Sequence, residues 1–421
     1  MKNIFPMVVA VRIKDYDLNL SIGGTEKRAM RTYEHFKSRG AYLIKYRDDS
    51  EVYEKVKSLG AKVVYNFGAP FSKQLADELR KLDVITAQST NFVEAYSPYI
   101  DHNIIISKFE YLKFVLMGKI NAKTSNVDII YSPQDVEFFR KKVKPMYSRE
   151  SEEEIVVGRI GRAEPTKWSS RIPAFLMWAA FSWRRTSSRK ITFIFVGVPL
   201  LYRAFIDPLK GILGRKNVYI RMYPEIRDIR RLPEFYQSID VFWQTAKIGE
   251  SFGNVIAESF ASGKPVITDC KYFYLKGRLR SDLYDSQIEL VDNKKTGFYV
   301  NFPSQFFDLI ENVEYSKLRS MGKKAIEKAY EFEKGKVMRV LEKALGGERA
   351  RLDLGEIQRE YTKKRDVFLK IDDEIGKVEK MYFKTFIFLY ELLESVYLAI
   401  RKGGKLCGLN LEDLNLIYDK R

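Results

Sequence analysis

Two glutamates in the second half of the chain, Glu250 and Glu258, lie in a segment that could bind an extended anionic ligand. Gly253 lies between them, just before a predicted helix whose first amides could bind a diphosphate. In a continuous helix the two carboxylates would be about 12 Å apart, too far to share one ligand atom. We therefore expect Glu258 to bind a ribose and Glu250 to contact a sugar. The residues predicted to bind this ligand are Phe252, Gly253, Asn254, Val255 and Glu258.

Two cations follow a predicted strand that ends near Gly158, namely Arg162 and Lys167. Arginine can bind two phosphate oxygens at once, while lysine acts as a mobile point charge, so the pair suits a diphosphate leaving group. With Glu250 they form the predicted catalytic set. Arg159 is a weaker candidate because it directly follows the strand. A solvated basic loop is the alternative interpretation of this segment.

A pair of glycines, Gly23 and Gly24, precedes a predicted helix in the first half of the chain. Paired glycines let the backbone approach a ligand, and the helix start favours a phosphate, although a plain strand-to-helix turn would look similar. We add Gly23 and Gly24 to the residues predicted to bind the ligand. The loop around Tyr223 is predicted to contact the base of a nucleotide.

Short β-branched runs alternate with longer amphipathic runs, which is typical of parallel strands joined by helices. A charged stretch, 140–154, divides two series of predicted strands and is interpreted as a linker. We expect two α/β, doubly wound, Rossmann-like domains with a ligand site in the cleft beyond the carboxyl ends of their strands. The strands are predicted at 5–11, 42–46, 62–65, 83–86, 103–107 and 127–131, then at 155–158, 191–196, 218–221, 241–245, 265–268 and 288–290.

The C-terminal region is predicted to be helical, with a helix at 336–345 closed by two glycines and a helical extension over 346–421. Apolar residues recur at helical spacing in this extension, for example Phe383, Phe386 and Tyr390. Packing on the rest of the protein or on a partner subunit is one interpretation, and docking on a membrane surface is the other. Three charged residues interrupt the apolar run, so we do not expect it to span a bilayer.

The net charge of +18 indicates an anionic partner, but it does not choose between nucleic acid, phosphorylated substrate and membrane surface. Basic residues are scattered and no reading module is visible, which argues against nucleic acid. Cys270 and Cys407 have neither metal-ligand nor disulfide spacing, which fits a reducing cytoplasm, with its membrane face as an alternative. The abundance of Lys, Glu, Tyr and Ile is a tendency of thermophile proteins.

With these segments in place, residues 1–345 resemble the retaining glycosyltransferases of the GT-B fold, a group that includes glycogen synthases, sucrose synthases and phosphatidylinositol mannosyltransferases. Glu250 and Glu258 look like the paired glutamates of this family, and Arg162 with Lys167 looks like its phosphate-binding pair. The resemblance implies a first, acceptor-side domain at 1–146 and a donor domain at 153–335. The helix at 336–345 would then cross back to the first domain.

The resemblance also implies a nucleoside-diphosphate sugar as donor, a glycan, lipid or protein as acceptor, and neither metal nor cofactor. The sugar would be transferred with retained configuration. Two features depart from the family pattern: Gln134 replaces a glycine, and the first-domain histidine near the donor sugar has no counterpart at 83–90. His102 precedes an apolar strand, and we expect it to be structural. The alternatives are a nucleotide-sugar epimerase of similar fold and a basic nucleic-acid-binding protein.

Overall fold

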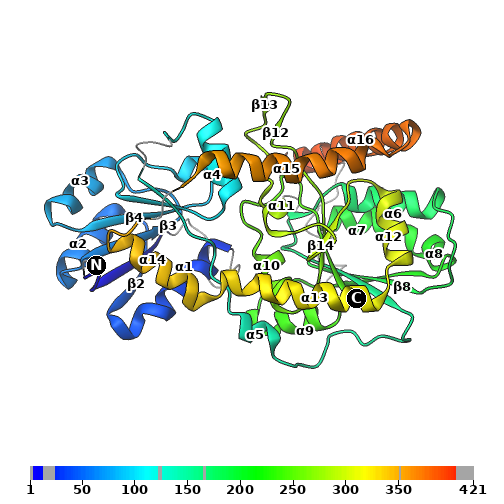
Figure 1. The fold of residues 1–421 in the computed structure, drawn as a ribbon, viewed down its shortest axis with the longest axis horizontal. Helices are drawn as coiled ribbons and strands as arrows, with labels where there is room; N and C mark the ends of the chain where they lie inside the picture. Colours follow the sequence, from blue (N-terminus) through cyan, green and yellow to red (C-terminus); the bar gives the residue numbers. More distant parts are fainter. Residues whose placement is uncertain (1–2, 13–23, 122–125, 165–166, 350–351, 404–421) are drawn as a thin grey trace.

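The computed structural model describes residues 3–12, 24–121, 126–164, 167–349 and 352–403. Two parallel sheets, each of six strands, form separate lobes with helices on both faces (Figure 1). The architecture is the predicted pair of Rossmann-like domains, followed by a helical C-terminal region. The antiparallel hairpin of β12 (Tyr274–Leu275) and β13 (Arg278–Leu279) projects from the second lobe.

The first sheet has the strand order β2-β1-β3-β4-β5-β6, and all its neighbouring strands pair in parallel. Its central strands are buried along almost their whole length, because helices cover both faces of the sheet and leave no solvated side. The strands are β1 (Met7–Arg12), β2 (Ala41–Tyr46), β3 (Val63–Phe67), β4 (Ile85–Thr90), β5 (His102–Ile105) and β6 (Val127–Ile129). Its helices are α1 (Gly24–Phe36), α2 (Asp49–Leu59), α3 (Lys73–Lys81) and α4 (Lys108–Leu116). The short helix α5 (Val136–Arg140) follows β6 in the chain but packs on helices of the second lobe.

The second sheet has the order β14-β11-β10-β7-β8-β9, also parallel throughout. Its strands are β7 (Ile155–Ile160), β8 (Ile191–Val196), β9 (Val218–Tyr223), β10 (Val241–Gln244), β11 (Val266–Thr268) and β14 (Gly297–Tyr299). Its helices are α6 (Arg171–Phe181), α7 (Leu200–Ile206), α8 (Leu209–Gly214), α9 (Leu232–Gln237), α10 (Asn254–Ala261), α11 (Ser286–Leu290), α12 (Pro303–Asn312) and α13 (Tyr315–Ala329).

One predicted strand is wrong. Residues 288–290 belong to helix α11, and the sixth strand of the second sheet is β14, Gly297–Tyr299. A buried helix of one turn and a buried strand show the same short apolar run, so periodicity cannot separate them. The Glu289 carboxylate on this helix accepts hydrogen bonds from the first amides of α4, those of Lys108 and Phe109.

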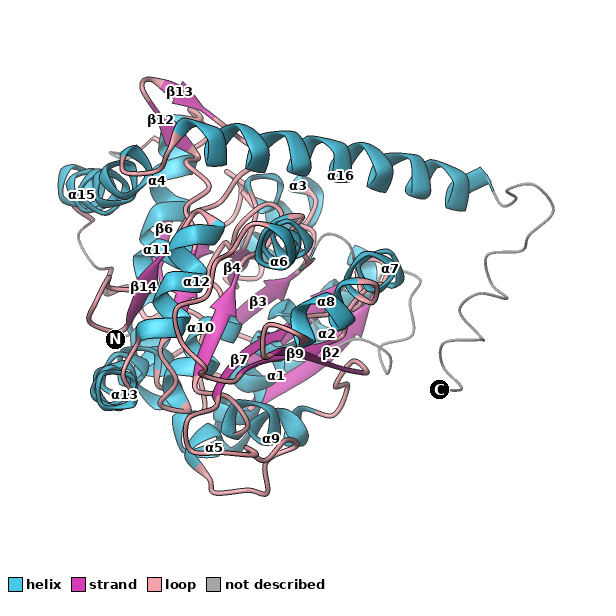
Figure 2. Ribbon diagram, turned by 90° about the vertical axis from the view of Figure 1, so that its right-hand side faces the viewer, coloured by secondary structure: helices cyan, strands magenta, loops and turns pink. Residues whose placement is uncertain are grey.

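Helix α14 (Lys334–Leu345) returns from the second lobe to the first (Figure 1). Its apolar side chains Val337, Met338 and Leu341 lie in one buried cluster with Met7 and Val9 of β1. Two further helices, α15 (Leu354–Asp373) and α16 (Lys377–Gly403), follow it. Helix α15 lies across the gap between the lobes, and α16 runs along the edge of the second lobe (Figures 1 and 2).

Candidate active site

A cavity of about 350 Å³ lies between the two lobes. Its walls are built largely from residues at or just beyond the carboxyl ends of strands, the place where doubly wound sheets bind ligands. The first lobe supplies Gly24, Thr25, Glu26, Lys27, Arg28, Asn91, Phe92, Ile106 and Ser132. The second lobe supplies Arg159, Ile160, Gly161, Arg162, Lys167, Glu225, Ile226, Arg227, Ile229, Leu232, Glu250, Ser251, Phe252, Gly253, Asn254, Val255 and Glu258.

Arg162 and Lys167 both line this cavity, on the turn that follows β7. The turn is anchored by Trp168, whose side chain is fully buried and whose ring N–H donates to the Arg162 carbonyl at 3.0 Å. Arg162 is 35% exposed and is paired with Glu164 at 3.2 Å, so its guanidinium is accessible to an anion. Two cations therefore lie beside the cavity, on a turn whose backbone is anchored by the buried Trp168 side chain.

Arg159, the weaker sequence candidate, is 2% exposed at the end of β7 and also lines the cavity. Its guanidinium donates to the Gln244 side-chain oxygen at 2.7 Å, and the Gln244 amide donates to Glu250 at 2.7 Å. Burial lowers the pKa of Arg159, although the nearby carboxylates of Glu250 and Asp269 oppose this effect. Glu250 is therefore oriented through Gln244 by a buried cation that does not touch it directly.

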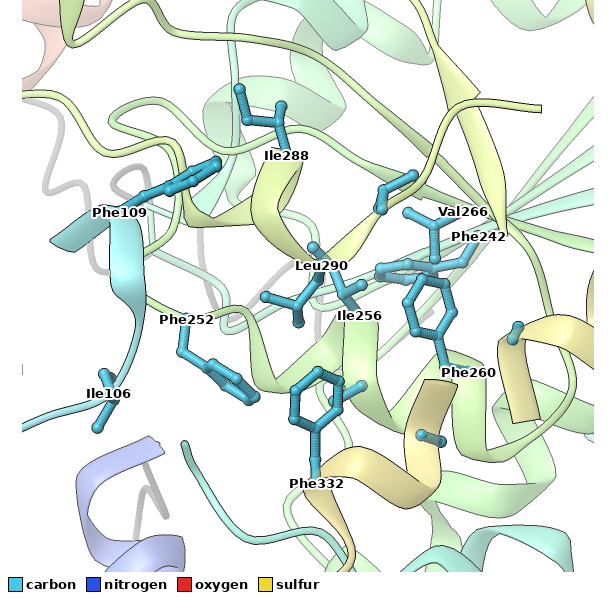
Figure 3. Packing of buried hydrophobic residues seen from close by; sticks show 14 of the residues in the cluster. Ile106, Phe109, Phe242, Phe252, Ile256, Phe260, Val266, Ile288, Leu290 and Phe332 are labelled. Carbon is cyan, nitrogen blue, oxygen red and sulfur yellow. The ribbon is translucent and has the colours of Figure 1, made fainter. Parts of the chain in front are cut away.

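The loop from Glu250 to Gly253 leads into α10, whose amino end faces the cavity. Gly253 precedes the helix with φ of 97°, a left-handed conformation that favours glycine. The Phe252 side chain points away into the core, where its ring lies 5.3 Å from that of Phe332 (Figure 3). At Phe252 the group available to a ligand is therefore the backbone, as it is at Gly253.

Glu258 lines the cavity on α10, but its side chain is only 1% exposed and its oxygens have protein partners. Lys27 and Arg31, both on α1 of the first lobe, lie 3.2 and 3.7 Å from one carboxylate oxygen. The Tyr236 hydroxyl donates to the other oxygen at 3.1 Å. The carboxylate thus joins the two lobes in this structure, a role that the sequence pattern did not predict.

Gln134, which departs from the family pattern, connects three parts of the molecule. Its side-chain oxygen accepts from Arg31 at 3.0 Å, and its amide donates to the Asn254 side chain at 2.8 Å. Its backbone N–H donates to the Phe332 carbonyl at 2.7 Å, just before α14. Asn254 also packs closely on Gly24, where an added Cβ would lie 2.9 Å from the asparagine amide nitrogen. Glycine at position 24 therefore allows α1 and α10 to meet.

Tyr223, predicted to contact a base, and His102, expected to be structural, do not line this cavity. Gly23 falls outside the described residues. Tyr223 ends β9 without lining the cavity, whereas Glu225, Ile226 and Arg227 just after it do. His102 is 5% exposed at the start of β5, opposite the cleft end of that strand, and its Nδ1 lies 2.8 Å from an Asp128 oxygen. This geometry supports the structural interpretation of His102.

Apart from Gly24, the sequence interpretation missed the first-lobe side of the cavity, above all Lys27, Arg28 and Asn91. Helical spacing on α1 could have indicated the two basic residues. Lys27, Arg28 and Arg31 follow Gly24 within two helical turns, so their side chains lie near the predicted glycine loop. Asn91 donates to the Thr25 hydroxyl at 2.8 Å and so ties β4 to the start of α1. Within the described ranges, no group of three or more His, Cys, Asp and Glu side chains could hold a metal ion.

The fold is that of GT-B glycosyltransferases. No family model and no curated protein sequence matches the chain, but solved structures do. A glycosyltransferase from Rickettsia africae ESF-5 has a TM-score of 0.58 at 14% identity, covering 80% of this chain and 97% of that one. Anabaena Alr3699/HepE in complex with UDP has 0.55 at 14%, covering 80% and 99%. The lipopolysaccharide outer core galactosyltransferase WaaB has 0.56 at 12%, covering 80% and 99%.

Proposed function

We propose that this chain is a retaining glycosyltransferase that transfers a sugar from a nucleoside-diphosphate sugar to an acceptor, without a metal ion. One observation carries the proposal: a single interlobe cavity is lined by the amino end of α10, by Arg162 and Lys167, and by Glu250. Because Anabaena Alr3699/HepE, which shares the fold, was solved with UDP and with UDP-glucose, uridine diphosphate sugars are the first donors to test.

The diphosphate of the donor would occupy the space between the cationic turn and α10. The first amides of a helix have no intrahelical partner, and the helix dipole there favours anions. The backbone N–H groups of Gly253, Asn254 and Val255 would therefore donate to phosphate oxygens. Arg162 and Lys167 would neutralise the opposite side. The buried Nε of Arg159 has no hydrogen-bond partner among the described residues and could be satisfied by a ligand oxygen.

In the proposed transfer, the bond between the sugar C1 and the diphosphate oxygen breaks, and the electron pair goes to the diphosphate. The acceptor hydroxyl forms the new bond on the same face of the sugar, and its proton passes to the departing diphosphate oxygen. Arg162, Lys167 and the α10 amides stabilise the charge that develops on the leaving group, as preorganised cations and dipoles do in a water-poor cleft. Glu250 would orient the sugar hydroxyls.

The acceptor would approach from the first lobe, because Thr25, Arg28 and Asn91 form the wall opposite the donor. Glu258 would bind the ribose by exchanging its contacts with Lys27 and Arg31 for ribose hydroxyls, since a carboxylate also accepts hydrogen bonds from hydroxyl groups. A donor that inserts between α1 and α10 would therefore loosen one interlobe contact as it binds.

The test is a panel of UDP-, GDP- and ADP-sugars, scored by thermal stabilisation and by hydrolysis. We expect at least one donor to raise Tm by about 2–4 °C at saturation, as binding to the folded state alone requires. Lys167→Ala should abolish the shift, whereas Lys55→Ala, on an exposed position of α2, should keep it. Proton NMR should show that the first free sugar released from an α-linked donor is the α anomer.

Three results would contradict the proposal. Absence of stabilisation by every nucleotide sugar would remove the donor site. Release of the β anomer from an α-linked donor would make the reaction inverting, and a sugar that changes configuration while still attached to nucleotide would indicate an epimerase instead.

A further inference from the structure

Helix α16 packs on the second lobe through one side only. Phe383 contacts Phe175, with ring centroids 5.4 Å apart, and Tyr390 contacts Tyr202 at 5.2 Å. Phe383 is 4% exposed and Tyr390 is 1% exposed, so this inner side belongs to the core of the lobe. The packing holds the helix along the edge of the molecule (Figure 2).

The opposite side of α16 presents apolar residues to solvent. We call this side the outer stripe: Val378, Met381, Phe388, Leu389, Leu392 and Val396, each between 48% and 75% exposed. Spacings of three, four and seven positions place these residues on one face over about 27 Å of helix. Soluble proteins seldom expose contiguous apolar surface of this kind unless it binds a partner or a membrane.

The charges of α16 are divided between its two sides. All three of its described glutamates face the protein: Glu379 accepts from the Ser304 amide at 2.9 Å, Glu391 from the Ser170 hydroxyl at 3.2 Å, and Glu394 is paired with Lys247. Lys377 and Lys384 are exposed. The outer stripe therefore carries no carboxylate from its own helix, is flanked by cations, and belongs to a chain of net charge +18.

We propose that the outer stripe of α16 docks this protein on the surface of an anionic lipid bilayer. An apolar face with flanking lysines and no exposed acid is the pattern of a helix that lies in the plane of the headgroups. The helix rests on the surface without crossing it: no described helix is long and apolar enough to span a membrane, and Glu394 and Glu391 are committed to the protein side. Attraction of the lysines to acidic headgroups adds to the burial of the stripe.

The proposal is tested by sedimenting the full chain with vesicles of phosphatidylcholine alone or with about 30% phosphatidylserine, a content that gives a strong negative surface potential. Wild-type protein should bind the anionic vesicles, less so as salt is raised. Leu389→Glu/Leu392→Glu should reduce binding by about tenfold or more, because it places two charges in the apolar contact. Lys377→Gln/Lys384→Gln should weaken binding to anionic vesicles by roughly fivefold per lysine.

The matched control is Val340→Glu, which puts one negative charge at a 44% exposed position of α14, on the first lobe and away from α16 (Figure 1). It should bind vesicles like the wild type, and every variant should keep the wild-type circular dichroism spectrum and Tm. Failure of the wild type to bind anionic vesicles, or equal binding by Leu389→Glu/Leu392→Glu, would overturn the proposal. So would a wild-type dimer that this double variant converts to monomers, because the stripe would then be covered by a second copy.

Discussion

Glu258 has two possible sets of partners, the first-lobe cations in this structure and a ribose in the proposed complex. Its carboxylate is 1% exposed and lies 3.2 Å from Lys27. Both roles need a full negative charge or at least two good acceptor oxygens, and an amide offers only one. Position 258 is therefore where the donor proposal can be tested with the smallest chemical change.

We predict that Glu258→Gln weakens donor binding by about tenfold and destabilises the free protein by roughly 1–3 kcal/mol, because Lys27 and Arg31 lose their partner. Calorimetric titration with the donor and urea unfolding measure the two effects. Glu54→Gln, on the exposed side of α2, is the matched control and should change neither. A variant that binds donor as tightly as the wild type would remove Glu258 from the site.

Lys113 predicts a pH dependence. Its side chain on α4 is fully buried against the second lobe, donating to the Leu283 carbonyl at 2.8 Å and lying 3.3 Å from the centre of the Tyr284 ring. Burial lowers its pKa from 10.5 to about 8. Between those values the unfolded state holds more protons than the folded state, so the contribution of Lys113 to stability rises with pH.

The free energy of unfolding of the wild type should therefore rise by roughly 1–2 kcal/mol relative to Lys113→Met between pH 8 and pH 9.5. Urea unfolding of both proteins at the two pH values measures this difference. Lys55→Met, at an exposed position, should track the wild type. If the difference in unfolding free energy between the wild type and Lys113→Met did not change with pH, Lys113 would titrate normally in the folded protein.

Much of the candidate site could be predicted from residue type and local context. Arg162, Lys167 and Glu250 come from turns after strands of one domain, and Glu258 lies on the helix that follows one of these turns. Parallel topology alone brings such turns and helix starts to one edge of the sheet. Lys27 and Gln134 could not be predicted in the same way. Their contacts depend on how the two lobes dock, and no local periodicity encodes that.

At the scale of elements, the junction of the Glu250–Gly253 loop with α10 is the most constrained. Gly253 has φ of 97°, and an added Cβ would lie 3.0 Å from the Ile256 side chain. An L residue in such a conformation costs about 1–2 kcal/mol. Strain at this position would also move the amides that are proposed to bind diphosphate.

Gly253→Ala should therefore lower the free energy of unfolding by about 1–2 kcal/mol and weaken UDP binding as well. The matched control is Gly211→Ala inside α8, where an added Cβ meets nothing within 4 Å. That change should be neutral or stabilise the protein by up to about 1 kcal/mol, because alanine loses less conformational entropy than glycine when the helix forms. Equal effects of the two substitutions in urea unfolding would contradict this account of the loop.

The fold shows where sequence periodicity succeeds and where it fails. Strand β8 occupies 191–196 as predicted, because its β-branched and aromatic residues favour an extended backbone and the run is buried on both faces. The sequence predicts a strand at 288–290, where the structure has α11, because a single buried helical turn is too short to show a helical periodicity. In the structure the Glu289 carboxylate accepts hydrogen bonds from the amides of Lys108 and Phe109 on α4, which is far away in sequence.

At the scale of the whole molecule, α15 fastens the two lobes together. Lys108 of the first lobe pairs with Glu360 of α15 at 3.3 Å, and the Tyr361 hydroxyl donates to Asp285 of the second lobe at 3.0 Å. Phe368 stacks on Tyr299 with ring centroids 4.0 Å apart and is fully buried. The compared structures leave about a fifth of this chain unmatched.

Phe368→Ala should destabilise the protein by about 3–5 kcal/mol, the usual cost of emptying a buried aromatic site. Phe388→Ala on α16 is the matched control: its side chain is 65% exposed, so we expect a change within about 0.5 kcal/mol. Chemical unfolding of the two variants measures both. A small effect of Phe368→Ala would mean that α15 contributes little to the stability of the fold.

The central claim is that a diphosphate binds between α10 and the turn that carries Arg162 and Lys167. Its most direct test is calorimetric titration of UDP into the wild type and into Arg162→Ala/Lys167→Ala. The account predicts that the wild type binds UDP in the absence of divalent metal. The double variant should raise Kd by about tenfold or more, since hydrogen bonds to charged groups contribute roughly 1.5–3 kcal/mol each. A wild type that does not bind UDP or any other nucleoside diphosphate, or a double variant that binds with unchanged Kd, would contradict it.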